Sequence, residues 1–81
     1  MKAEEMFKEL GYKKVESLDL DTLAEYIYGD EEEGCYEDIA FCKDHMRINV
    51  EYPDYMLMDA IFKQIEEMRE REDEDWKRNV F

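Results

Sequence analysis

The sequence has few residues of the kinds on which most metal centres depend. It contains one histidine, His45, and two cysteines, Cys35 and Cys42. Six residues separate the cysteines and two separate Cys42 from His45, which matches no common zinc motif. The acidic stretch Asp30 to Gly34 has its glycine one place too early for an EF-hand loop. The sequence therefore predicts no metal site, and it shows no cofactor motif.

Signatures of catalysis are also missing. A carboxylate pair can act as acid and base only where its surroundings separate the two pKa values, and a chain with 24 acidic residues brings carboxylates together by chance. Cys42 follows Phe41 in a strand-like pattern, and the sequence places no cation or helix start beside it to activate the thiol. We therefore expect a protein that is not an enzyme.

Long apolar runs and a disulfide framework are absent too. No segment approaches the roughly 20 apolar residues that span a bilayer, and residues 1–20 contain no signal-peptide-like stretch. Small secreted domains stapled by disulfides usually have four cysteines or more, so we expect a cytoplasmic protein. Because the chain has no linker or repeat and is 44% hydrophobic, it is predicted to fold as a single domain over residues 1–81.

Apolar periodicity predicts two helices, one near each end of the chain. Lys2 to Leu10 has apolar residues at helical spacing and is followed by Gly11, a typical residue at a helix C-terminus. After Pro53 an apolar stripe begins at Leu57. Oppositely charged pairs at helical spacing favour continuation of this second helix towards Lys77.

Three segments between these helices have the pattern of antiparallel strands. Leu23 to Tyr28 fits a helix or a strand, and we favour the strand because Glu37 to Lys43 and Met46 to Tyr52 alternate in the same way. The predicted fold class is therefore α+β, in the order helix, three-stranded antiparallel sheet, long C-terminal helix. The predicted core consists of Ile39, Phe41, Ile48, Val50, Ile61 and Ile65.

Acidic residues are concentrated in one part of the chain. Ten acidic residues and no lysine or arginine lie between Val15 and Cys42, so this segment supplies −10 of the net charge of −13. The last helix mixes its signs, with seven acids and four bases from Glu66 to Arg78. Like charges in one segment repel each other and lower stability, so their concentration indicates a function.

Two interpretations of this acidic segment remain open. In the first, the charge keeps a small protein soluble and nothing binds to it. In the second, the carboxylates mimic the phosphates of duplex DNA, which carries one negative charge per roughly 1.7 Å, and occupy a basic groove on another protein. Exposed ion pairs contribute little individually, so mimicry also needs non-ionic anchors, for which the candidates are Tyr26, Tyr28, Tyr36 and Trp76. The predicted partner-binding residues are Asp30, Glu31, Glu32, Glu33, Tyr36, Glu37, Asp38 and Trp76.

Two stretches carry a resemblance to known proteins. The opening MKAEEMFKELGYKKVE and the later FKQIEEM resemble small uncharacterised proteins of phages and prophages of Gram-positive bacteria. The resemblance implies a phage-encoded protein in the cytoplasm of a host cell, and it implies no catalytic residues.

Charge and resemblance together suggest a non-enzymatic interaction protein. A net charge of −13 repels nucleic acid and anionic membranes and attracts basic protein surfaces. The expected partner is a host protein with a basic, nucleic-acid-binding surface, such as a defence nuclease (a CRISPR or restriction enzyme) or a transcription factor. The alternative is a small homo-oligomeric structural or assembly protein in which Trp76, Val80 and Phe81 mediate self-association and the charge serves only solubility.

Overall fold

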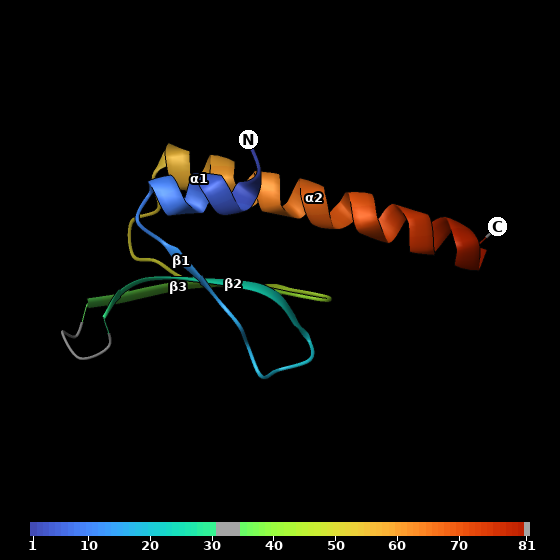
Figure 1. Ribbon diagram of the computed structural model, residues 1–81, viewed down its shortest axis with the longest axis horizontal. Coiled ribbons are helices and arrows are strands. Elements are labelled where there is room, and N and C mark those ends of the chain that lie inside the picture. Colours follow the sequence, from blue (N-terminus) through green and yellow to red (C-terminus); the bar gives the residue numbers. More distant parts are fainter. Residues whose placement is uncertain (31–34, 81) are drawn as a thin grey trace.

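Two helices cover one face of a four-stranded antiparallel sheet in the computed structural model (Figure 1). The structure describes residues 1–30 and 35–80, without the side chains of residues 30, 35 and 71–80. The elements follow the chain as α1 (Ala3–Glu9), β1 (Lys13–Val15), β2 (Thr22–Asp30), β3 (Cys35–Cys42), β4 (Met46–Asn49) and α2 (Tyr55–Val80). The α+β class and both helices are confirmed, whereas the prediction of three strands is wrong.

The additional strand, β1, follows directly from the end of α1. Gly11 adopts a φ of 94°, which is accessible to glycine without a Cβ penalty, and lets the chain reverse after the helix. Lys14 then lies opposite Tyr26 in the β1–β2 pairing. The strand is only three residues long and contains two lysines, so the sequence has too little alternation there to reveal it.

Strand alternation gives the sheet two distinct faces. The order is β1-β2-β3-β4, with Tyr26 opposite Ile39 and Ile39 opposite Ile48, which puts these three side chains on the face covered by the helices, called here the inner face. Their neighbours in sequence lie on the other face, called here the open face, which includes Glu25, Ile27, Asp38, Ala40 and Arg47. The segment at 23–28, which fits a helix or a strand by pattern, is thus confirmed as a strand.

Aromatic packing joins α1 to the inner face. The ring of Phe7 stacks on Tyr26 with centroids 4.0 Å apart, and it meets Tyr12 and Phe41 edge-on at 5.8 and 6.2 Å. Phe7 and Tyr26 are both fully buried. Tyr26 therefore belongs to the core, which removes it from the candidates for non-ionic anchors.

The predicted core is largely confirmed. Ile39, Phe41 and Ile61 have no more than 1% of their surface exposed, and Val50 and Ile65 pack against the core at its margin. Ile48 is 41% exposed, so its prediction as a core residue is wrong. Its side chain is on the inner face, but β4 is the edge strand and no further strand flanks it.

Polar contacts fix the position of α2. The Asp54 carboxylate accepts a hydrogen bond from the Leu57 amide at 2.8 Å, which caps the helix N-terminus. The Glu67 carboxylate accepts one from the Ala3 amide at 2.7 Å, which joins α2 to the start of α1. Among the described residues, no helix is long and apolar enough to cross a membrane.

Candidate interaction surface

The loop between β1 and β2, residues 16–21, is a compact turn built by its own polar side chains. Ser17 Oγ accepts a hydrogen bond from the Asp19 amide at 3.1 Å, and Asp19 Oδ1 accepts one from the Asp21 amide at 3.0 Å. These side-chain-to-backbone bonds form the Asx and related turns expected of Asp and Ser. The loop projects from the sheet on the side away from both helices (Figure 1).

This loop exposes acidic and apolar side chains in alternation. Glu16, Asp19 and Asp21 are exposed, and Leu18 and Leu20 between them are also almost completely exposed. A loop held in shape by hydrogen bonds keeps these side chains available without a large loss of entropy on binding. Residues 16–21, called here the acidic loop, therefore combine negative charge with non-ionic contact area.

The acidic loop is tied to the turn between β3 and β4. The Lys43 amide donates to the Asp21 carbonyl oxygen at 3.0 Å, and Lys43 Nζ lies 3.8 Å from the Asp21 carboxylate. This ion pair is largely exposed to solvent, so its contribution to stability is small. Its main consequence is that a cation partly neutralises the last carboxylate of the loop.

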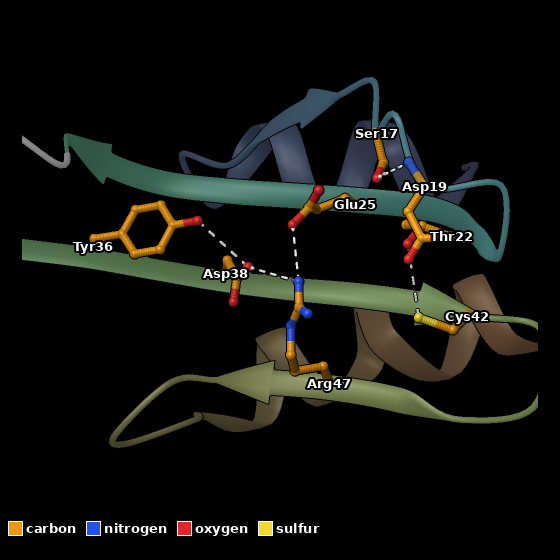
Figure 2. Close-up of polar contacts among 8 residues, drawn as sticks. All are labelled: Ser17, Asp19, Thr22, Glu25, Tyr36, Asp38, Cys42 and Arg47. Carbon is orange, nitrogen blue, oxygen red and sulfur yellow. Dashed lines mark hydrogen bonds and ion pairs between the residues drawn. The ribbon is translucent and has the colours of Figure 1, made fainter.

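On the open face, two carboxylates and one guanidinium form a cluster that joins three strands (Figure 2). Arg47 Nη2 lies 3.5 Å from Glu25 Oε2 and 3.6 Å from Asp38 Oδ2. Burial, together with the hydrogen bond and negative charge of Asp38, raises the pKa of Glu25, and Arg47 offsets this in part. Glu25 therefore holds a proton more readily than an isolated, exposed glutamate would.

Of three neighbouring predicted partner-binding residues, two lie at this cluster and one lies on the opposite face. Asp38 is 5% exposed and faces Arg47, and Tyr36 donates a hydrogen bond to Asp38 at 3.4 Å. Glu37 points to the inner face and accepts a hydrogen bond from the Tyr12 hydroxyl at 2.9 Å. Burial, followed by this bond to Glu37, raises the pKa of Tyr12. Asp38 and Glu37 thus have partners within the fold.

The remaining predicted residues lie wholly or partly outside the described structure. Asp30 is the last residue of β2, and its side chain is not described. Glu31, Glu32 and Glu33 are outside the described residues. Trp76 lies within α2, and its side chain is likewise outside the description. Their role in binding stays a prediction.

The acids of the acidic loop belong to the segment without bases predicted from the sequence, but none of them is among the predicted partner-binding residues. Leu18 and Leu20 were missed altogether as non-ionic anchors, because an isolated leucine in a sequence gives no sign of its exposure. The sequence does contain one sign of this surface. Residues 16–21 include neither glycine nor proline, and leucines and acids alternate from Leu18 to Asp21. Tyr28, another proposed anchor, is 46% exposed and its ring lies against Tyr12.

A cleft of about 520 Å³ lies between the helices and the inner face near β2. At its wall the Tyr26 hydroxyl donates to Gln64 Oε1 at 2.7 Å, and burial raises the pKa of Tyr26 to about 12. The charged residues at the cleft are Lys2, Glu4, Lys14, Lys43 and Glu67. Since three lysines and two glutamates line it, the cleft has no single sign of charge that would select one class of ligand.

Other reactive groups are few in the described part of the chain. Cys42 is buried and its sulfur lies 3.9 Å from the Thr22 hydroxyl. His45 Nδ1 lies 2.6 Å from the Asp44 carboxylate, and this hydrogen bond lowers the pKa of Asp44. No group of three or more potential metal ligands comes together among the described residues.

Comparison of the chain with models of protein families, with curated proteins and with solved structures finds no match. The resemblance of residues 1–16 to phage proteins therefore stays a prediction, and function has to be argued from the surface itself.

Proposed function

We propose that the protein is a non-enzymatic acidic interaction protein that binds a basic, nucleic-acid-binding surface of another protein by mimicking nucleic acid. The observation that carries this proposal is the acidic loop, where Glu16, Asp19 and Asp21 are exposed beside two exposed leucines. Lysine and arginine side chains that bind phosphates can bind carboxylates of similar density, with the same release of counterions.

The leucines supply what charge alone does not. An exposed ion pair contributes only about 0 to 1 kcal/mol, so a few carboxylates do not account for a stable complex. Burying Leu18 and Leu20, which are almost fully exposed in the free protein, would contribute about 1.5 to 3 kcal/mol each. A partner with a basic rim around an apolar contact patch fits this arrangement.

The second acidic segment, Asp30 to Glu33, belongs to the same proposal on grounds of charge. In the sequence it falls between β2 and β3, whereas the acidic loop precedes β2. A partner with an extended basic groove could contact both. In keeping with the resemblance of the first 16 residues, we propose that the protein is phage-encoded, acts in the host cytoplasm, and targets a defence nuclease or a transcription factor.

The experiment is capture of partners from a bacterial lysate, followed by binding to the purified partner. We expect the affinity to fall steeply between about 0.05 and 0.5 M salt and the complex to compete with duplex DNA. In the test variant, Glu16→Gln, Asp19→Asn and Asp21→Asn remove three charges. Asparagine at position 19 keeps the oxygen that accepts the Asp21 amide, so the loop keeps its shape.

A matched control removes three exposed charges from the helices instead, by Glu5→Gln, Glu9→Gln and Glu70→Gln. We expect the loop variant to lose at least tenfold in affinity and the control to lose much less. A second variant, Leu18→Ser with Leu20→Ser, should weaken binding without changing its salt dependence. Equal affinities for the parent and the loop variant, or binding that is insensitive to salt, would show that the acidic loop is only a solvated turn.

A further inference from the structure

A small pocket lies where the connection from β4 to α2 passes the end of α1 (Figure 1). Its volume is about 270 Å³. Tyrosines, carboxylates and aliphatic residues line it, and all of them are described by the structure: Tyr12, Tyr28, Tyr52, Glu37, Asp54, Leu10, Val50 and Leu57. This described lining contains no lysine, arginine or histidine. The site, called here the tyrosine pocket, therefore differs from the larger cleft, where both signs of charge are present.

Two tyrosine rings are accessible at this pocket. Tyr28 is 46% exposed and Tyr52 is 85% exposed. The Tyr28 ring lies against Tyr12, with the ring planes tilted by 47°, and it lies so close to Gly11 that a Cβ there would be 2.8 Å from it. These contacts hold Tyr28 in place as one wall of the pocket. The face of such a ring attracts a cation within about 6 Å of the ring centroid.

The two carboxylates of the pocket have neutral donors as partners. Glu37 Oε2 accepts the Tyr12 hydroxyl at 2.9 Å, and Asp54 Oδ1 accepts the Leu57 amide at 2.8 Å. Within residues 1–30 and 35–70, the ion pairs involve other carboxylates, those of Asp21, Glu25, Asp38, Asp44 and Glu66. Burial, then the bond and charge of Glu37, then the charge of Asp54 raise the pKa of Tyr12. Both carboxylates thus act on this site, and no cation of the described fold pairs with them.

This lining suits the guanidinium group of arginine better than it suits other organic cations. A guanidinium is planar, stacks on aromatic faces and donates hydrogen bonds to carboxylates in pairs. A quaternary ammonium has no N–H to donate to Glu37 or Asp54, and a primary ammonium is compact and strongly hydrated. Leu10 and Val50, which are half-buried, and the buried Leu57 provide apolar contact for the methylene groups of an arginine side chain.

We propose that the tyrosine pocket binds an arginine side chain of another polypeptide, whose guanidinium lies against Tyr28 and Tyr52 and donates to Glu37 and Asp54. The size of the pocket favours a side chain over a free ligand. Its volume of about 270 Å³ is below the roughly 300 to 1,000 Å³ of sites that enclose small molecules. It is also open to solvent at Tyr52, so a polypeptide can deliver one side chain into it from outside.

The tyrosine pocket is separate from the acidic loop. The loop ends at Asp21, and Tyr28 lies seven residues further along the chain in β2, which is roughly 23 Å at 3.3 Å per residue. Charges that far apart are screened at about 0.15 M salt, where the Debye length is about 8 Å. The proposal for the pocket therefore does not rest on the proposed function, and each of the two can fail while the other holds.

The test is an NMR titration of the isotope-labelled full chain with the peptide acetyl-Gly-Arg-Gly-amide, at about 0.15 M salt. We expect saturable amide shifts confined to the surroundings of the pocket, including Tyr12, Tyr28 and Tyr52, with a dissociation constant on the order of 1 mM. The control peptide has citrulline in place of arginine, which keeps the shape and removes the charge, and should bind at least about tenfold more weakly. The corresponding lysine peptide should also bind more weakly than the arginine peptide.

Two exposed tyrosines provide a matched pair of variants. Tyr52 lines the pocket, whereas Tyr55, which is 90% exposed, is not among the lining residues. Tyr52→Ala should weaken binding of the arginine peptide at least about fivefold, and Tyr55→Ala should leave it unchanged. Glu37→Gln removes a charge but keeps an acceptor for the Tyr12 hydroxyl, and it should weaken binding by a similar factor. The triple variant of the acidic loop should bind the peptide like the parent.

Circular dichroism spectra establish that each variant is folded. No saturable shift near the pocket, or equal affinities for the arginine and citrulline peptides, would overturn the proposal. A folded Tyr52→Ala variant that binds like the parent would do the same, and equal binding of the lysine peptide would overturn the assignment to a guanidinium. Ethylguanidinium carries the same cation without a peptide, so tighter binding of this compound than of the arginine peptide would overturn a polypeptide as the source of the group.

Discussion

Truncation of two isoleucines separates the observed core from the core that alternation predicts. Ile61 has none of its surface exposed and Ile48 has 41% exposed. Replacement of isoleucine by alanine removes three carbons, worth about 2.4 kcal/mol when fully buried at about 0.8 kcal/mol each. The cavity left at Ile61 adds to this, which gives about 3 to 4 kcal/mol for Ile61→Ala. At Ile48 about six tenths of the surface is buried, so Ile48→Ala should lower the free energy of unfolding by about 1.4 kcal/mol, without a cavity term.

The assay is urea unfolding followed by circular dichroism, at low protein concentration so that self-association does not contribute. A domain of this length has a total stability of about 4 to 12 kcal/mol, so Ile61→Ala can come close to unfolding the protein. Ile61→Val, expected to cost about 0.5 to 1.5 kcal/mol, then gives a measurable point. Equal losses for Ile61→Ala and Ile48→Ala would refute the assignment of β4 to the margin of the core.

Three further substitutions test particular contacts. The pKa of Glu25 is raised in the folded protein, so loss of its proton lowers the free energy of unfolding as pH rises from about 4.5, its ordinary pKa, through the folded pKa. Glu25→Gln should remove this loss of stability, which makes the plot of unfolding free energy against pH flatter. Gly11→Ala should cost about 1 kcal/mol or more in urea unfolding, since φ is 94° and a Cβ would lie 2.8 Å from the Tyr28 ring. Tyr26→Phe removes the hydroxyl bonded to Gln64 and should lower the melting temperature by the equivalent of about 0.5 to 1.5 kcal/mol.

Periodicity was sufficient to predict most of the fold. The helical spacing before Gly11 and after Pro53 corresponds to α1 and α2, and the alternation of residues 37–43 and 46–52 corresponds to β3 and β4. Alternation shows which face of a strand a residue occupies, but not whether another strand lies beyond it. Alternation therefore predicts the same burial for Ile39 and Ile48, and their exposure differs because β4 lies at the edge of the sheet.

The candidate surface was predicted less well, because exposure depends on partners that are distant in sequence. Asp19 and Asp38 are both acids in a segment without bases. Asp19 is exposed, whereas Asp38 is nearly buried because Arg47 from β4 lies beside it on the open face. No local pattern in the sequence predicts that Arg47, nine residues after Asp38, will lie beside that carboxylate while Asp19 has no cation beside it in the described structure.

The same comparison shows how the fold distributes its excess negative charge. On the open face, where Glu25 and Asp38 would otherwise repel each other at close range, a single guanidinium reduces the cost, and the charge of Asp38 contributes to the raised pKa of Glu25. In the acidic loop the carboxylates are exposed, and water and salt screen their repulsion, so little stability is lost although, among the described residues, only Asp21 has a lysine beside it. The nearly buried Asp38 thus has a cation beside it, whereas Glu16 and Asp19 of the acidic loop face solvent. Under the proposed function, the acidic loop is therefore where a basic partner supplies cations that the described part of the fold provides only through Lys43.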